Sequence, residues 1–540
     1  MDPCFSFRIK MVRQVQINLT PEAAADMAAV RKISASLAGI NQSEITSLRI
    51  LKRSVDARKQ KIRVNLSVEI FSGDDTDVAA LAPFMPQDVR KAREVIIVGA
   101  GPAGLFAALR LIELGIRPVL IERGNDVSSR KKDIARISRE HIVDPESNYC
   151  FGEGGAGTYS DGKLYTRSKK RGDNTRILEL LCFHGANNNI MYEAHPHLGT
   201  DKLPGIISNI RKSIVDAGGE FLLGKKVTDL IISKDSVEGV VTSDGDRYLS
   251  SYVILATGHS ARDIYEICRM RGVDLVMKSF AMGVRVEHPQ ELIDTIQYHG
   301  NKRGEFLPAA SYSLAKQVDG RGVYSFCMCP GGFIVPSATS QEEVVVNGMS
   351  PSGRNSPYAN SGIVVEIRPE DLLKYSSSGE MAGIEFQKEL EREAWKNGGH
   401  TQCAPAQRLA DFVDGVTSAS LPKVSYFPGV SSSPLHSWLP RSIGRRLRDG
   451  FRLFGHMMKG YLTNDAVVLG VESRTSSPVR IPRDPETLQH IRIGGLYPCG
   501  EGSGYAGGIV SSAVDGMNAA EAIMLQMKSA KAHYSSANTG

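Results

Sequence analysis

The sequence lacks features that mark several large classes of protein. Among its 540 residues there is no run of eighteen or more uninterrupted apolar residues, so we expect no membrane-spanning helix. The excess of positive charge is only +6, which does not by itself favour nucleic acid or a membrane surface as a partner. Residues 1–11 lack the apolar core of a secretory signal. These absences predict a soluble intracellular protein.

Cysteine is scarce and scattered along the chain. None of the eight cysteines forms a CxxC pair, and their density is far below that of a disulfide-stapled domain. We therefore expect a reducing compartment. The cysteines are Cys4, Cys150, Cys182, Cys268, Cys327, Cys329, Cys403 and Cys499.

The stretch from Val95 to Glu122 carries the strongest signal of a cofactor site. A β-branched run, residues 95–98, is typical of a buried parallel strand, and a glycine-rich turn and a helical apolar pattern follow it. Gly99 permits the tight turn, Gly101 lets the backbone approach a pyrophosphate, and Gly104 lets the helix pack on the strand. A second strand ends on Glu122, whose carboxylate can accept hydrogen bonds from a ribose diol. This context favours dinucleotide binding over an ordinary glycine-rich turn.

Two further passages are rich in glycine. Residues 151–164 hold five glycines within eleven positions, which is unfavourable in a core element because each glycine costs conformational entropy. Residues 495–509 hold a third such run, followed by a helix of small residues. Such passages suit backbone that lies against a flat ligand, whereas the alternative is a mobile surface loop. No second GxGxxG occurs, although a dedicated nicotinamide domain would normally need one.

The rest of the chain predicts an α/β protein of several parts. A hydroxyl N-cap at Thr20, followed by proline, predicts a helix that runs to about residue 38. Apolar and polar residues alternate strictly over residues 62–70, which predicts a half-buried strand with one face in solvent. We expect residues 337–362 to form a loop. The predicted divisions are a small α+β module (1–72), a linker (73–91), the first part of the dinucleotide domain (92–279), a substrate domain (280–474), the returning part of the dinucleotide domain (475–527) and a disordered tail (528–540).

The chain has a single GxGxxG motif, after the first strand of the dinucleotide domain, and a Gly-acid turn before the last helix. This combination resembles that of the two-domain FAD-dependent oxidoreductases. More narrowly, five strings resemble a family of uncharacterised FAD-dependent dehydrogenases of bacteria and plant plastids. They are FGEGGAGTYSDGKL (Phe151–Leu164), ESRTSSPVRIPRD (Glu472–Asp484), LYPCGEGSGYAGGI (Leu496–Ile509), SFCMCPGG (Ser325–Gly332) and KRSVDAR (Lys52–Arg58).

The resemblance implies a split Rossmann-like FAD-binding domain of the glutathione-reductase/hydroxylase kind, with an inserted mixed α+β substrate domain. It implies an oxidoreductase that moves a hydride or two electrons between an organic substrate and non-covalent FAD, with NAD(P)H as a candidate transient reductant. It also implies the plastid stroma, with the cytoplasm as the alternative. The substrate is a small molecule, with an anion as one candidate, and it is not identified by the resemblance.

Carried over by position, the resemblance implies a set of cofactor-binding residues. The ADP half of FAD would lie on Gly99, Gly101, Ala103, Gly104, Glu122 and Arg123, with the adenine near Val227. The ribityl chain and ring would lie along Gly155, Thr158, Asp161, Gly258, Gly500 and Glu501. The N-terminus of the last helix, at Gly507, Gly508 and Ile509, would point its N–H groups at the pyrimidine end of the ring.

Candidates for the chemistry itself are fewer. Arg474 and Arg480 precede the return to the flavin domain and could clamp a carboxylate or phosphate, with Glu472 neutralising one of them; an inter-domain salt-bridge patch is an equal alternative. His259 could act as a base or acid near the flavin, although a histidine hydrogen-bonded at a strand end is favoured. Arg474, Arg480 and His259 are therefore the predicted catalytic residues.

Other clusters are interpreted more simply. Cys327 and Cys329 would face one side of a strand, and we favour small apolar packing over a dithiol that faces the flavin. The basic loop at residues 52–61 is interpreted as a solvated face. His195 and His197 have ligand-like spacing but no recognisable third ligand, so we expect no metal. The alternatives to an oxidoreductase are a partner-binding relative that has lost catalysis and an RNA-modifying flavoprotein that uses the basic loop.

Overall fold

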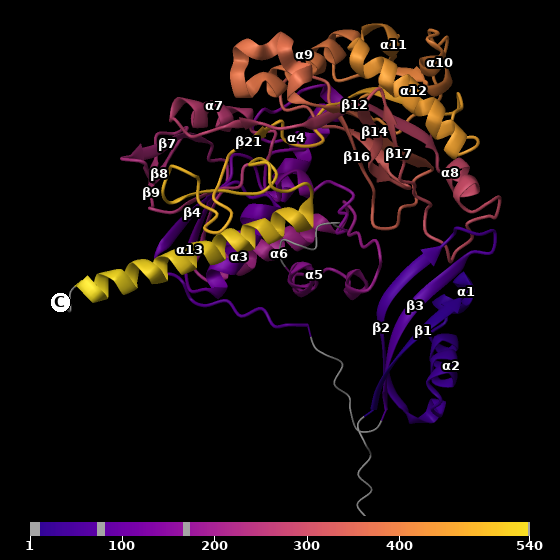
Figure 1. Cartoon of the computed structure of the whole chain (residues 1–540), viewed down its shortest axis with the longest axis horizontal. Helices are drawn as coiled ribbons and strands as arrows, with labels where there is room; N and C mark the ends of the chain where they lie inside the picture. Colours follow the sequence, from indigo (N-terminus) through magenta and orange to yellow (C-terminus); the bar gives the residue numbers. More distant parts are fainter. Residues whose placement is uncertain (1–10, 73–80, 166–172, 538–540) are drawn as a thin grey trace, which may run out of the picture.

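The structure is a computed structural model that describes residues 11–72, 81–165 and 173–537. Figure 1 shows the N-terminal module as a lobe beside two larger domains. The first part of the predicted linker, residues 73–80, lies outside the described residues. Residues 81–91 do not form a free linker, because Phe84 and Val89 are buried against the flavin domain.

The N-terminal module is a three-stranded antiparallel sheet covered by helices. The strand order is β1-β3-β2, and the alternation predicted over residues 62–70 places Val64, Leu66, Val68 and Ile70 in the core. Asp26 divides the predicted single helix into two, because its carboxylate accepts the backbone N–H of Ala28 as an N-cap. The elements are β1 (Met11–Leu19), α1 (Pro21–Ala25), α2 (Met27–Ala38), η1 (Gln42–Glu44), β2 (Ile45–Asp56) and β3 (Arg63–Ser72).

The flavin domain is built on a five-stranded parallel sheet of order β22-β10-β4-β5-β6. Because β22 comes from the C-terminal part of the chain and pairs with β10, the domain is split in sequence, as predicted. Its strands are β4 (Glu94–Val98), β5 (Arg117–Ile121), β6 (Glu220–Leu222), β10 (Val253–Leu255) and β22 (Leu496–Pro498).

Helices cover one face of this sheet, and a small sheet with a further helix covers the other. The first face packs against α3 (Pro102–Glu113), α5 (Asn174–Phe183), α6 (Leu203–Asp216) and α13 (Ile509–Ala537). The second face packs against β7 (Val227–Ser233), β8 (Ser236–Thr242), β9 (Arg247–Leu249) and α7 (Arg262–Met270). The other helices of this domain are α4 (Val127–Glu140), η2 (Gly155–Gly157) and η3 (Asn188–Met191).

The last helix corrects one prediction. The disordered tail was expected from residue 528, but α13 continues to Ala537 and lies beside α3 (Figure 1). No glycine or proline interrupts residues 517–537, so no local signal stops the helix where the polar tail begins.

The substrate domain is a seven-stranded sheet of order β13-β14-β17-β12-β20-β18-β19. All of its pairings are antiparallel except that of β18 with β19. The strands are β12 (Phe280–Pro289), β13 (Ala315–Val318), β14 (Arg321–Cys329), β17 (Tyr358–Ile367), β18 (Ala404–Arg408), β19 (Val430–Ser432) and β20 (Val467–Glu472). Two pairs of short strands stand apart: β11 (Val276–Met277) with β21 (Val479–Arg480), and β15 (Phe333–Pro336) with β16 (Val346–Met349).

The predicted loop at residues 337–362 is wrong. It contains β16 and the first half of β17, an inner strand of the large sheet. Gly362 is closely packed in this strand, because a Cβ at this position would lie 3.2 Å from the side chain of Glu472. The helices of this domain are α8 (Gln290–Gln297), η4 (Pro369–Met381), α9 (Ala382–Asn397), α10 (Leu409–Asp414), α11 (Leu435–Trp438) and α12 (Arg441–Met457).

Candidate active site

The three glycine-rich passages converge at the N-terminus of α3. A Cβ on Gly155 would lie 3.0 Å from the Cα of Gly101, and one on Gly157 would lie 3.2 Å from Pro102 and 3.5 Å from Ile509. The separations from Gly101 and Pro102 are tighter than ordinary van der Waals contact, so side chains there would push the passages apart, and the one from Ile509 is an ordinary contact. Segments that are far apart in the sequence therefore build one site around the starts of two helices.

Both helix starts suit a negatively charged ligand. The N-cap of α3 is Gly101, which has no side chain to cap the helix, and Pro102 occupies the first helical position. A Cβ on Gly507 or Gly508 would meet no described atom within 4 Å, so the start of α13 faces open space. Free backbone N–H groups at helix starts bind pyrophosphate. The residues at these two helix starts fit a cofactor such as FAD, which carries a pyrophosphate.

Glu122 stands at the end of β5 beside this site, as predicted. Its carboxylate is 6% exposed and accepts the backbone N–H groups of Ala100 at 2.9 Å, Gly124 at 3.0 Å and Gly152 at 2.9 Å. The carbonyl of Glu122 accepts the N–H of Lys225 at 2.9 Å, which brings Val227 to the same end of the sheet. The acid and the predicted adenine contact therefore lie together.

Three other predicted cofactor residues are held by protein partners. Arg123 donates to Asp263 at 2.8 Å and lies 4.5 Å above the ring of Phe151. The hydroxyl of Thr158 donates to a carbonyl at 2.8 Å, and Asp161 is 1% exposed and pairs with Arg354 at 2.7 Å. These side chains shape the glycine passage rather than reach into open space, so their predicted contact with the cofactor stays a prediction.

Glu501 and His259 form a polar pair where the last glycine passage meets the turn after β10. Nδ1 of His259 lies 3.6 Å from Oε1 of Glu501. Burial, helped by the charge of Arg474, lowers the pKa of His259 to about 4, so its ring is neutral at pH 7. Burial raises the pKa of Glu501 to about 7 against the pull of Lys278. Near neutral pH this carboxyl can therefore both hold and release a proton.

Lys278 lies near Glu501, and its positive charge opposes the rise in the pKa of that carboxyl. Beside the pairing of β11 with β21, the backbone N–H of Lys278 donates to the carbonyl of Pro478 at 2.8 Å, two residues before Arg480. Arg480 is exposed, and its guanidinium lies 5.4 Å from the ring of Tyr505. Burial and the charge of Arg480 lower the pKa of Lys278. The prediction missed Lys278, because only the pairing of strands about 200 residues apart brings it to Arg480.

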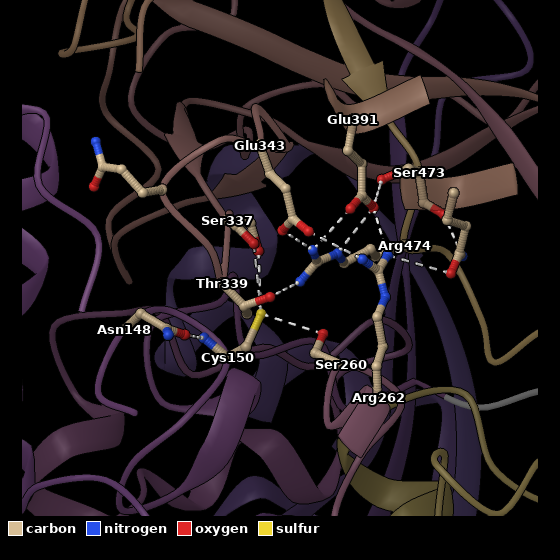
Figure 2. Close-up of polar contacts among 12 residues, drawn as sticks. Asn148, Cys150, Ser260, Arg262, Ser337, Thr339, Glu343, Glu391, Ser473 and Arg474 are labelled. Carbon is tan, nitrogen blue, oxygen red and sulfur yellow. Dashed lines mark hydrogen bonds and ion pairs between the residues drawn. The ribbon is translucent and has the colours of Figure 1, made fainter. Parts of the chain in front are cut away.

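Arg474 belongs to a different group, shown in Figure 2. It is 7% exposed and contacts Glu343 at 2.8 Å, Glu391 at 2.9 Å and the hydroxyl of Thr339 at 2.8 Å. Arg262 contacts the same Glu391 at 2.8 Å. We call Arg262, Arg474, Glu343 and Glu391 the closed cluster, since two arginines face two carboxylates. It joins α7 of the flavin domain to α9 of the substrate domain.

The prediction that Glu472 neutralises either Arg474 or Arg480 is wrong. Glu472 pairs with Arg285 of β12 at 2.7 Å and not with Arg474. On β20, Glu472 faces the neighbouring strand, whereas Arg474 comes after the strand end and points toward α9. For Arg474, the structure matches the salt-bridge alternative.

The favoured apolar packing for Cys327 and Cys329 is also wrong. The ammonium group of Lys163 lies 3.6 Å from the sulfur of Cys327 and 3.8 Å from that of Cys329. Lys163 ends the second glycine passage, so these sulfurs lie against it.

Within residues 11–72, 81–165 and 173–537, no group of three or more His, Cys, Asp or Glu side chains could hold a metal ion, and no helix is long and apolar enough to cross a membrane.

Comparisons with known protein families divide the chain into three. Residues 93–280 match the family described as pyridine nucleotide-disulphide oxidoreductase, and residues 279–475 match FAD-dependent protein, C-terminal domain-like. Residues 11–71 match a domain of unknown function.

Individual proteins are also similar to this chain. An uncharacterized protein of Clostridium beijerinckii is 39% identical over 532 residues, which cover 95% of this chain and 98% of that protein. Thiamine thiazole synthase of Aeropyrum pernix is 29% identical over 183 residues, 31% of this chain and 55% of that protein. Among solved structures, the match to a flavin-dependent brominase covers 81% of this chain and 79% of the brominase chain. The sequence identity is 15% and the TM-score is 0.34.

Proposed function

The chain belongs to the same family of FAD-dependent oxidoreductases as the Clostridium protein, and from that premise we propose that it is a dehydrogenase acting on a small anionic substrate. The observation that carries the proposal is the meeting of three glycine passages at the starts of α3 and α13. FAD bound there supplies a two-electron acceptor. The substrate site is the edge of this meeting point, at Lys278, Arg480 and Glu501.

The residues at this edge have separate tasks in the proposal. Lys278 and Arg480 attract a carboxylate or phosphate of the substrate and orient it. Glu501 accepts the proton that a hydroxyl or amine loses as it is oxidised, because the pKa of its carboxyl is raised to about 7. His259, neutral at that pH, contacts Glu501 without adding a second positive charge.

We also infer a reducing intracellular compartment, plastid stroma or cytoplasm, since the described cysteines are free. NAD(P)H is proposed as a transient reductant that visits the same cleft. An RNA substrate is disfavoured, because Arg53 pairs with Glu193 and Arg58 with Asp56, which neutralises part of the basic loop.

The purified protein tests the proposal directly. We expect a yellow protein whose FAD is released into the supernatant by acid, and reduction of that FAD by NADH or NADPH under anaerobic conditions. The double variant Lys278→Ala, Arg480→Ala should keep FAD and bind a generic dianion such as sulfate more weakly. Lys302→Ala, in an exposed loop, is the control. Colourless protein that refuses added FAD would overturn the proposal.

A further inference from the structure

Cys327 and Cys329 lie at the end of β14 in an irregular strand segment. Two residues of β14 stand opposite one residue of β17, between the pairs Phe326–Gly362 and Cys329–Asn360. Such a bulge re-aims side chains and is common beside active sites. Cys327 has a φ of 47°, in the left-handed region that non-glycine residues rarely adopt. The backbone therefore departs from regular strand geometry at the residue that presents the first sulfur.

Two cations hold this pair from different elements. Lys163, from the second glycine passage, has its ammonium within 4 Å of both sulfurs. Arg285, from β12, donates to the carbonyl of Cys327 at 2.8 Å and lies 3.6 Å from the sulfur of Cys329. The thiol of Cys329 folds back onto the carbonyl of Cys327, 3.3 Å away. The two side chains are thus directed to one place.

The charges around the pair do not balance. Arg354 pairs with Asp161 at 2.7 Å, and Arg285 pairs with Glu472 at 2.7 Å, which leaves Lys163 near Asp161 at 3.9 Å. When Asp161 and Glu472 are both ionised, three cations against two carboxylates leave 3 − 2 = 1 positive charge, which a thiolate at Cys327 would neutralise. We call Cys327, Cys329 and these charged residues the thiol cluster. They are Lys163, Arg285, Arg354, Asp161 and Glu472.

The titration of the two thiols follows this arrangement. A hydrogen bond from Cys329, together with Lys163 and Arg285, holds the pKa of the Cys327 thiol well below its usual range, against burial and the charge of Asp161. The same hydrogen bond, with burial, raises the pKa of Cys329 well above its usual range. One sulfur is a ready nucleophile and the other keeps its proton.

The thiol cluster also borders the cofactor site. Cys327 lies close enough to Glu501 for a thiolate there to raise the pKa of that carboxyl. Lys163 closes the glycine passage whose earlier residues contact the start of α3. The cysteine pair therefore lies on the part of the substrate domain that borders the flavin domain.

We propose that Cys327 and Cys329 are a redox pair that carries two electrons from FAD to a disulfide substrate. The inference rests on the proposed function and names the class of electron acceptor for that site. The surrounding cations, the paired sulfurs and the neighbouring glycine passage are the features expected of a nucleophilic thiol with a resolving partner.

The step balances as follows. The Cys327 thiolate attacks one sulfur of the substrate; a new S–S bond forms, the substrate S–S bond breaks, and the leaving thiolate takes a proton from solvent. Cys329 then attacks the sulfur of Cys327, closing the Cys327–Cys329 disulfide and releasing the second half with the proton of Cys329. The substrate gains two electrons and two protons. The pair is restored by two electrons from reduced FAD and one proton.

An electron count on the holoenzyme tests the pair. The protein is first treated with oxidised glutathione as the probe disulfide, then titrated anaerobically with dithionite. We expect uptake of about four electrons per bound FAD, two by the flavin and two by the disulfide, and about two in Cys329→Ser. Mass spectrometry should find the oxidised peptide lighter by two hydrogens. Uptake of only two electrons, with both thiols still open to N-ethylmaleimide, would overturn the proposal.

Alkylation of the thiols tests the cluster without relying on activity or on FAD. Cys182, also half-buried, is the internal control, because burial and Glu179 raise the pKa of its thiol to about 11. At pH 6.5, iodoacetamide should label Cys327 at least about tenfold faster than Cys182. Lys163→Met should slow labelling of Cys327 by about tenfold, and Lys212→Met, on the exposed face of α6, should not. Equal labelling rates of Cys327 in wild type and Lys163→Met would show that Lys163 does not stabilise a thiolate at Cys327.

The two tests separate this inference from the proposed function. If the protein binds no FAD but Cys327 is labelled fast, the proposed function is refuted and the thiolate at Cys327 is still supported. Protein with reducible FAD, but with a two-electron titration, would refute the redox pair alone.

Discussion

Two groups of charge join the flavin domain to the substrate domain, and they differ in how completely they are neutralised. In the closed cluster, two arginines meet two carboxylates in contacts of 2.8 to 3.2 Å, and Glu391 is fully buried. In the thiol cluster, the cations outnumber the carboxylates, and two sulfurs share the space. A balanced buried network supports the fold, whereas an unbalanced one beside a cofactor site is poised for chemistry.

The largest effect is expected from breaking the balanced cluster. Glu391→Gln leaves Arg262 and Arg474 buried with one carboxylate, and should lower the free energy of unfolding by about 3–5 kcal/mol at pH 7. Urea unfolding measures this loss. The control is Glu389→Gln on the same helix, whose partner Lys374 lies 2.6 Å away but whose side chain is 48% exposed. That variant should lose less than about 1 kcal/mol. Similar losses in the two variants would remove the distinction between buried and exposed pairs.

The two clusters should also respond to pH in opposite directions. Although burial opposes it, the charges of Arg262 and Arg474 lower the pKa of Glu391 from 4.5 to about 2, so its contribution to stability is present above pH 4.5 and lost as the pH falls toward 2. Burial raises the pKa of Glu472 from 4.5 to about 7, so its contribution is present below pH 4.5 and lost as the pH rises through 7.

Glu472→Gln isolates the second response. From pH 5 to pH 8, the free energy of unfolding of wild type should fall relative to that of the variant by about 3 kcal/mol, the equivalent of the pKa shift. Urea unfolding at several pH values gives the difference directly. A difference that does not change with pH would mean that Glu472 is ionised throughout this range beside Arg285.

This contrast also marks what the sequence alone could predict. The glycines at 99, 101 and 104 act through their own backbone, so their spacing was enough to place them. The partners of Arg474 and Glu472 are set by the pairing of β20 with β12 and by the approach of α9, which no local pattern encodes. Both arginine–carboxylate assignments therefore needed the fold, and so did Lys163 beside two cysteines that the chain places about 160 residues away.

Glu122 holds a buried charge in a third way, with backbone N–H groups in place of cations. Glu122→Ala removes the acceptor of three such groups and the expected ribose contact, so FAD affinity should fall by about 1.5–3 kcal/mol. Equilibrium titration of the flavin-free protein with FAD measures the loss. Arg90→Ala is the control, because its guanidinium pairs with Asp88 and both side chains are 65% exposed. FAD affinity equal to that of wild type in Glu122→Ala would place the ribose elsewhere.

The smallest effect is expected where charges join two parts of the chain at the surface. Arg53 of β2 contacts Glu193 at 3.0 Å, and both side chains are about a quarter exposed. The backbones of the two segments are also joined, because the N–H of Arg53 donates to the carbonyl of Tyr192 at 2.8 Å. Water screens this pair, and the backbone bonds survive a side-chain change. Arg53→Ala should therefore cost about 0.2–1 kcal/mol and leave FAD bound. A loss as large as that of Glu391→Gln would show that the N-terminal module is held by this pair. The free energy of unfolding in urea, measured at low and high salt, decides between these outcomes, because only an exposed pair weakens as salt is added.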